Sequence, residues 1–152
     1  MNKKIPSRKE CLEPAKACMC FSLRKTARAI TQRYEALLRP LGLKATQFSL
    51  LVGVRLLGGV TVNRLAEAMV MDRTTLTRNL KPLENQGLIQ TVPGSDRRER
   101  EITLTPTGES MLAKALPLWK KAQGQVQQDI GKDRFGRLLT DLQATVEATQ
   151  AG

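Results

Sequence analysis

The sequence predicts a mainly α fold of the α+β class, in which one β-hairpin lies among helices. Three observations predict it. Apolar residues recur every three or four positions over most of the chain, as on one side of an α-helix. This period changes to two only after Leu88, where a hairpin is expected. Cap residues, glycines and prolines separate the periodic segments, and the 152 residues fit a single domain, 1–152.

The first long helix is expected from Pro14 to about Arg39, with Pro14 in its first turn and Pro40 after its end. Its apolar side is formed by Ala27, Ile30, Tyr34, Leu37 and Leu41. A second helix is expected between a cap at Thr46 and a stop at Gly58. It is almost entirely apolar, and we therefore expect it to be buried.

Two short helices joined by a tight turn follow, and they form a helix-turn-helix pattern. Thr61 caps the first, and Asp72 caps the second, which continues to about Gln86 before a stop at Gly87. The hairpin comes next, with alternating apolar residues on both sides of the turn at 93–95. Residues 43–105 are therefore expected to form a winged helix-turn-helix lobe with a two-stranded β wing.

A long helix is expected to begin at Thr105 and Pro106, which fit a cap and a first-turn proline, and Pro117 should kink it. Its apolar side consists of Leu112, Ala115, Leu116, Trp119, Ala122, Val126 and Ile130. A last helix carries Phe135, Leu138, Leu139, Leu142 and Val146 on one side. These apolar stripes are too extensive for one small core. Residues 1–42 and 106–152 are therefore expected to be the dimerisation helices of a homodimer.

The composition favours a polyanionic partner and argues against catalysis. The net charge is +11, from 25 Lys and Arg against 14 Asp and Glu. The sequence contains no histidine, no glycine-rich phosphate loop and no Gly-x-Ser-x-Gly motif, so we expect no enzyme and no cofactor. We find neither a run of about 18 apolar residues nor a signal-like N-terminus. A cytoplasmic protein without a membrane partner is expected.

One side of the helix that begins at Asp72 is suited to reading DNA. Thr74, Thr77, Arg78 and Lys81 lie on the side opposite the apolar Leu76, Leu80 and Leu83, and Arg73 and Asn79 flank them. Such side chains offer hydrogen bonds to base edges and positive charge to phosphates in the major groove. An ordinary solvated helix surface is the alternative interpretation.

The tip of the hairpin strengthens the DNA interpretation. Arg97, Arg98 and Arg100 lie within four positions, and arginines on a projecting ribbon suit the narrow minor groove. The alternative is a surface charge cluster in which Asp96 and neighbouring glutamates neutralise these arginines. Both hold together if Asp96 orients Arg98 toward DNA.

Three segments in register resemble the MarR family of bacterial regulators: LAEAMVMDRTTLTR at 65–78, GLI at 87–89, and DRREREITLT at 96–105 followed by Gly108. The resemblance extends from about Arg24 to the end of the chain. It implies a homodimer that binds a pseudo-palindromic double-stranded operator, usually as a repressor, and releases it when an effector binds. It also implies that Arg98 enters the minor groove while Asp96 holds it, and that the helix after Asp72 is the recognition helix.

The candidate DNA-binding residues are thus Arg73, Thr74, Thr75, Thr77, Arg78, Lys81, Asp96, Arg97, Arg98 and Arg100. The protein is then expected to be nucleoid-associated when it is bound. Pro82 departs from an ideal recognition helix because a proline removes a hydrogen bond and bends the axis. The alternative function is a sequence-blind architectural nucleic-acid-binding protein, which operator competition would distinguish.

The cysteines at 11, 18 and 20 are not part of the family pattern, and we interpret Cys11, Cys18 and Cys20 as candidate effector sensors. On a continuous helix Cys18 and Cys20 point to opposite sides, and Cys11 lies about 10 Å from Cys18, beyond the roughly 7 Å limit for a disulfide. Nearby cations favour thiolates that react with an oxidant or bind a soft metal ion. The alternatives are inert, buried cysteines and a small aromatic effector in a crevice between the dimerisation helices and the DNA-binding lobe.

Overall fold

The computed structural model describes residues 5–94, 96 and 99–150. In chain order its helices are α1 (Arg8–Ala17), α2 (Met19–Leu38), a 3-10 turn η1 (Arg39–Leu41), α3 (Ala45–Leu57), α4 (Val62–Ala68), α5 (Arg73–Asn85), α6 (Pro106–Ile130) and α7 (Lys132–Gln150). The strands are β1 (Val60–Thr61), β2 (Ile89–Pro93) and β3 (Arg100–Leu104). The mainly α fold with a winged helix-turn-helix is confirmed.

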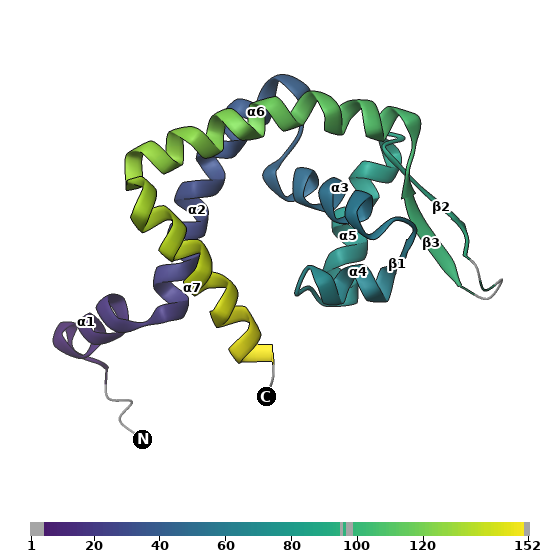
Figure 1. Cartoon of the computed structure of the whole chain (residues 1–152). Coiled ribbons are helices and arrows are strands. Elements are labelled where there is room, and N and C mark those ends of the chain that lie inside the picture. Colours follow the sequence, from purple (N-terminus) through teal and green to yellow (C-terminus); the bar gives the residue numbers. More distant parts are fainter. Residues whose placement is uncertain (1–4, 95, 97–98, 151–152) are drawn as a thin grey trace.

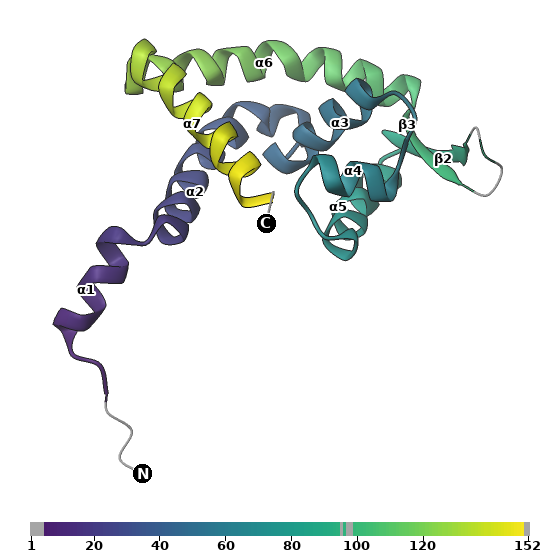
Figure 2. The ribbon, with the colours of Figure 1, turned by 60° about the horizontal axis from the view of Figure 1, so that its bottom comes forward.

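Figure 1 shows two regions joined by α6, which starts beside the sheet and runs to the other side of the molecule. On one side α3, α4, α5 and the sheet form a lobe around a common core. On the other side α2 packs against α6, and α7 turns back from the end of α6. In Figure 2, α1 extends away from the rest of the chain, and none of its residues is buried.

The core of the lobe is built from the apolar residues that the helical spacing singled out. Leu50, Leu51, Leu65, Leu76 and Leu83 are fully buried within it. Phe48 of α3 stacks on Trp119 of α6, with ring centroids 6.3 Å apart, and this contact joins the lobe to the long helix. Apolar burial of this kind is the main stabilising contribution to the lobe.

The sheet has a third strand that the sequence analysis did not predict. β1 pairs with β3 in antiparallel orientation, with Val60 opposite Ile102, and both side chains are buried. β3 is therefore the central strand, and the wing hairpin is anchored in the lobe at its base. Two residues are too few to show a period of two, which explains why this strand was missed.

The long N-terminal helix expected from Pro14 to Arg39 was wrong at its start. The backbone leaves the helix at Cys18, where φ is −74° and ψ is 114°, and two helices result. A capping box between Ser7 and Glu10 starts α1 well before Pro14, which lies inside the helix. The Cys18 thiol then caps α2 by accepting a hydrogen bond from the Phe21 amide at 3.4 Å.

One smaller expectation also needs correction. The cap of α3 is Lys44 rather than Thr46, because the Gln47 side chain accepts a hydrogen bond from the Lys44 amide at 2.9 Å. α6 continues through Pro117 to Ile130, and the kink expected at Pro117 stays a prediction. The expected caps at Thr61, Asp72 and Thr105 are confirmed, since each side chain accepts a hydrogen bond from an amide three residues later.

Candidate nucleic-acid interface

The start of α5, the predicted recognition helix, is fixed by Asp72. The Asp72 carboxylate accepts hydrogen bonds from the Thr75 amide at 2.8 Å and the Thr75 hydroxyl at 2.6 Å. These bonds stabilise the charged form and hold the pKa of the Asp72 carboxyl below its ordinary value. The Thr75 hydroxyl, a candidate for DNA contact, donates its hydrogen within the protein.

The two sides of α5 separate as the sequence predicted. Leu76, Leu80 and Leu83 are buried in the lobe. The opposite side is exposed and lines an open groove of about 830 Å³. The residues that line this first groove are Arg73, Thr74, Thr77, Arg78, Lys81, Pro82 and Asn85. The structure thus brings five of the predicted residues together.

Pro82 and Asn85 were not predicted to belong to this surface. The helix passes through Pro82 and ends at Asn85, so the surface is one turn longer than a helix broken at Pro82 would allow. The helical spacing from Arg78 to Lys81 and Asn85 is the signal that would have identified Asn85. Lys81 lies beside an acid, because its ammonium is 3.3 Å from the Glu84 carboxylate.

A second groove lies on the other side of Arg73, between the start of α4, the start of α5 and the wing. It is lined by Thr61, Val62, Asn63, Arg73, Thr91, Glu99 and Arg100, and its volume is about 420 Å³. Arg73 lines both grooves, so the recognition helix and the base of the wing form one continuous surface. Asn63 and Thr91 are additions that only the packing of three separate segments reveals.

Some of the charged residues predicted for the wing are described by the structure. Arg100 is exposed on β3, and its guanidinium donates a hydrogen bond to the Thr91 carbonyl at 3.4 Å. The Asp96 carbonyl accepts a hydrogen bond from the Glu99 amide at 2.9 Å and helps to form the turn. Arg97 and Arg98 lie outside the described residues, and so does the expected contact between Asp96 and Arg98.

The three cysteines lie on the N-terminal helices, remote in sequence from both grooves. All three are free thiols; Cys11 and Cys20 are exposed, and Cys18 is partly buried at the break between α1 and α2. Because Cys18 is not in a helix, the expectation that Cys18 and Cys20 point to opposite sides no longer follows. Among the described residues no group of three or more His, Cys, Asp or Glu is arranged to hold a metal ion.

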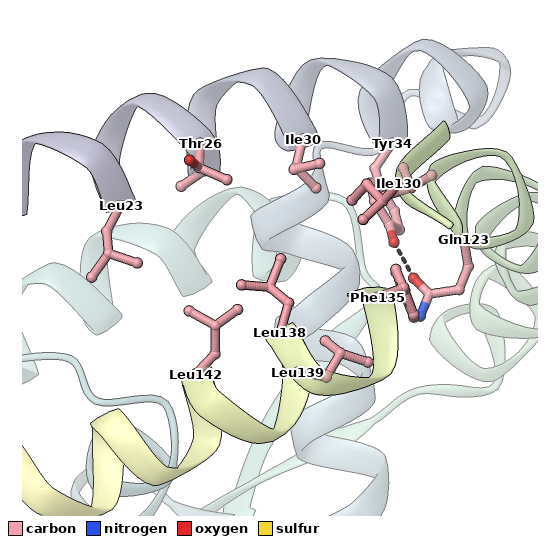
Figure 3. Close-up of a pocket in the computed structure, with 12 residues that line it drawn as sticks. Leu23, Thr26, Ile30, Tyr34, Gln123, Ile130, Phe135, Leu138, Leu139 and Leu142 are labelled. Atoms are coloured by element: carbon pink, nitrogen blue, oxygen red, sulfur yellow. Dashed lines mark hydrogen bonds between the residues drawn. The ribbon is translucent and has the colours of Figure 1, made fainter. Parts of the chain in front are cut away.

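An apolar pocket of about 300 Å³ lies between α2, α6 and α7 (Figure 3). Most of its lining is aliphatic, from side chains such as Ile30 and Leu142. Its polar lining residues include Tyr34, whose hydroxyl donates a hydrogen bond to the Gln123 side chain. Burial raises the pKa of Tyr34, since the low-dielectric surroundings disfavour a phenolate. A crevice next to the DNA-binding lobe was expected from the sequence, whereas this pocket is lined by α2, α6 and α7.

No helix in the described part of the chain combines the length and the apolar character that crossing a membrane requires.

Comparison with known proteins places this geometry in a family. The model of the MarR family matches residues 41–99, which include the helix-turn-helix and the first part of the wing. The transcriptional regulator MosR of M. tuberculosis, solved in complex with DNA, is 38% identical with a TM-score of 0.78, and the match covers 88% of this chain and 97% of MosR.

Two curated relatives also match the sequence of this chain. The multiple antibiotic resistance protein MarR of Salmonella typhimurium is 31% identical over 111 residues, which are 72% of this chain and 72% of that protein. The uncharacterised HTH-type regulator YwoH of Bacillus subtilis is 32% identical over 91 residues, which are 60% of this chain and 66% of YwoH.

Proposed function

Because the chain belongs to the MarR family of DNA-binding transcriptional regulators, we propose that it binds a pseudo-palindromic operator as a homodimer and represses transcription until an effector releases it. The family membership also means that the chain is a regulator and not an enzyme. The homodimer, the pseudo-palindromic operator, the repression and the release by an effector are the proposed parts.

The observation that carries the proposal is the position of Arg73 between the two grooves. A helix in the major groove and a hairpin over the adjacent backbone need an unbroken surface, and Arg73 supplies a positive charge at the junction. Arg78 and Lys81 extend this charge along the helix, and Arg100 extends it along the wing. The MosR relative was solved in complex with DNA, which supports DNA as the partner of this chain.

The test is operator selection from randomised duplexes, followed by binding measurements on variants. Arg98→Ala should weaken operator binding by roughly 1–3 kcal/mol, because a minor-groove contact is lost. Arg78→Ala should relax the base preference, because its side chain faces the bases from the recognition helix. Lys121→Ala, which removes an exposed cation of α6, is the matched control and should bind like the wild type.

Two outcomes would contradict the proposal. Binding of Arg98→Ala within twofold of the wild type would remove the wing from the interface. Equal competition by operator, bulk DNA and RNA would instead favour a sequence-blind architectural protein, the alternative function that the charge alone permits.

For the homodimer, the supporting observation is apolar surface that this chain does not bury. Leu138, Leu139, Leu142 and Val146 of α7 are 37–49% exposed, and three of them also line the pocket between α2, α6 and α7. Leu23 of α2 lines the same pocket and is 39% exposed. A second copy of the chain supplies a matching surface around a two-fold axis, as closed symmetry requires.

For the effector, accessible thiols favour an oxidant. Cys11 and Cys20 are exposed. Cys18 lies at a helix break, where a disulfide bond can form without unwinding a continuous helix. A relative that is 33% identical over 96 residues is named as an organic hydroperoxide resistance regulator of Bacillus subtilis, although the match spans 65% of that protein. We therefore propose that oxidation of these thiols releases the operator.

Replacement of all three cysteines by serine tests this step. The wild type should release operator DNA on treatment with peroxide, and the serine variant should not. Copper, zinc, arsenite and aromatic acids are applied in parallel, because a soft metal ion or a small aromatic molecule is the competing effector class. Wild-type protein that keeps its DNA under oxidant would contradict the thiol mechanism.

A further inference from the structure

A series of polar contacts connects the recognition helix to the wing. The Lys81 ammonium lies 3.3 Å from one oxygen of the Glu84 carboxylate. The other oxygen accepts a hydrogen bond from the Thr91 hydroxyl on β2 at 3.4 Å. The Thr91 carbonyl in turn accepts from the Arg100 guanidinium on β3 at 3.4 Å. The Glu84 carboxylate thereby links α5 to β2, and Thr91 extends the series to β3.

The ends of this series lie in different grooves. Lys81 lines the first groove, along the recognition helix, whereas Thr91 and Arg100 line the second groove, at the base of the wing. Glu84 lines neither groove and touches a residue of each. A carboxylate facing phosphates would be repelled by them, so Glu84 is suited to holding cationic groups and not to contacting DNA itself.

Folding stability does not account for this arrangement. The side chains of Lys81 and Glu84 are 67% and 43% exposed, and an ion pair this exposed contributes little to the free energy of unfolding. The ion pair instead affects the direction of the Lys81 side chain and the net charge of this part of the surface. The pair restricts where the flexible Lys81 stem can reach, and it offsets a positive charge that would otherwise bind any phosphate backbone.

We propose that Glu84 is a positioning residue for operator recognition, which holds Lys81 and the wing in a fixed relation and thereby favours the operator over other DNA. This inference rests on the proposed operator binding. Without the carboxylate, Lys81 is free to neutralise a phosphate on any duplex, and the wing loses one of its contacts to the recognition helix. Affinity for non-specific DNA then rises while discrimination falls.

The experiment measures binding to operator and to scrambled duplex over a range of salt concentrations. Glu84→Gln should steepen the slope of log K against log salt by about 0.9, the value for one additional phosphate contact. It should lower the ratio of operator to scrambled affinity by about threefold to tenfold. Thr91→Val, which replaces the hydroxyl with a methyl group, should lower the ratio but leave the slope unchanged.

A second set of variants, made in a protein that lacks Lys81, separates the contribution of Lys81 to the salt slope. In a Lys81→Met protein, Glu84→Gln should no longer change the salt slope, because the cation that it releases is absent. The matched control is Glu67→Gln, which removes the same charge from an exposed site on α4 and should leave the ratio as in the wild type. All variants should melt at the wild-type temperature, because the pair is exposed.

Either of two results would contradict the positioning role of Glu84. If Glu84→Gln and Glu67→Gln have the same slope and ratio, or if Thr91→Val retains full discrimination, the positioning role of Glu84 is overturned. A wild-type protein that prefers no sequence overturns the proposed function itself, and that result is recognised before any variant is compared.

Discussion

At the scale of single residues, the turn of the helix-turn-helix contains a strained position. Val70 has a φ of +52°, in the left-handed region that a β-branched side chain rarely adopts. The backbone is held there by hydrogen bonds from the Val70 amide to the Glu67 carbonyl and from the Met71 amide to the Ala66 carbonyl. The side chain is 57% exposed, so it gains little from burial.

Val70→Gly should therefore stabilise the protein. Left-handed geometry costs a non-glycine residue roughly 1–2 kcal/mol, and the additional freedom of glycine in the unfolded chain cancels about 0.5–1 kcal/mol of the gain. We expect the free energy of unfolding to rise by about 0.5–1 kcal/mol in chemical denaturation at fixed protein concentration. Val70→Ala keeps the Cβ atom and should fall between the two, and a less stable glycine variant would contradict the strain.

A second residue links stability to pH. The pKa of Asp72 is lowered in the folded protein, so its contribution to stability is present above the ordinary carboxyl pKa and is lost as the pH falls through the folded value. Asp72→Asn keeps a capping acceptor but loses the charge at the start of α5. The wild type should be more stable than this variant at pH 7, and the difference should shrink below about pH 4. Urea midpoints across this range test it, and a difference independent of pH would contradict it.

At the scale of elements, the start of α6 is fastened to the end of the recognition helix. The Thr105 hydroxyl donates a hydrogen bond to the Gly87 carbonyl at 2.5 Å, and the Thr105 amide donates to the Leu88 carbonyl at 3.1 Å. Gly108 is buried against the same segment, and a Cβ atom there would lie 1.9 Å from the Leu88 oxygen. This close approach joins the long helix rigidly to the DNA-binding lobe.

Gly108→Ala should disturb this junction. The added methyl meets a backbone oxygen that cannot rotate away, and overpacking of this kind costs about 1–3 kcal/mol. Gly136→Ala is the control, because nothing lies within 4 Å of the added atom and alanine favours the helix by about 1 kcal/mol. Thermal melting should show opposite shifts, and an unchanged melting temperature for Gly108→Ala would mean that α6 is not tightly seated.

At the scale of the whole molecule, one face of the chain is left apolar. The pocket with the exposed leucines of α7 is lined by residues near the C-terminal end of α6 (Figure 3), whereas the lobe that carries the two grooves lies at the other end of that helix (Figure 1). A second copy that covers this face would leave both reading surfaces accessible, as two operator half-sites about one helical turn apart require.

Sedimentation should therefore detect a dimer at micromolar concentration. Leu139→Glu should dissociate it, because a carboxylate would be buried without a partner in an apolar interface. Leu56→Glu is the matched control, since Leu56 is 79% exposed on α3 in the lobe, and this variant should remain dimeric. A stable wild-type monomer would contradict the proposed assembly.

Much of this architecture is determined by the sequence alone, because the deciding interactions are local. The apolar spacing of Leu76, Leu80 and Leu83 sets the buried side of α5, and the same spacing assigns Thr77 and Arg78 to the exposed side. Side-chain caps act within three residues, which explains why the starts of α4, α5 and α6 are predictable.

Tertiary structure alone decided the features that join distant segments. β1 forms because Val60 pairs with Ile102 of the wing. Arg73 lines two grooves because three separate segments pack around it. The break between α1 and α2 at Cys18 is likewise not encoded by the helical period. The position of Glu84 in the sequence predicts only an ordinary exposed acid. Its contact with Thr91 arises when the hairpin folds back beside α5. Local periodicity and capping specify the elements, whereas their mutual contacts depend on how the buried faces fit together.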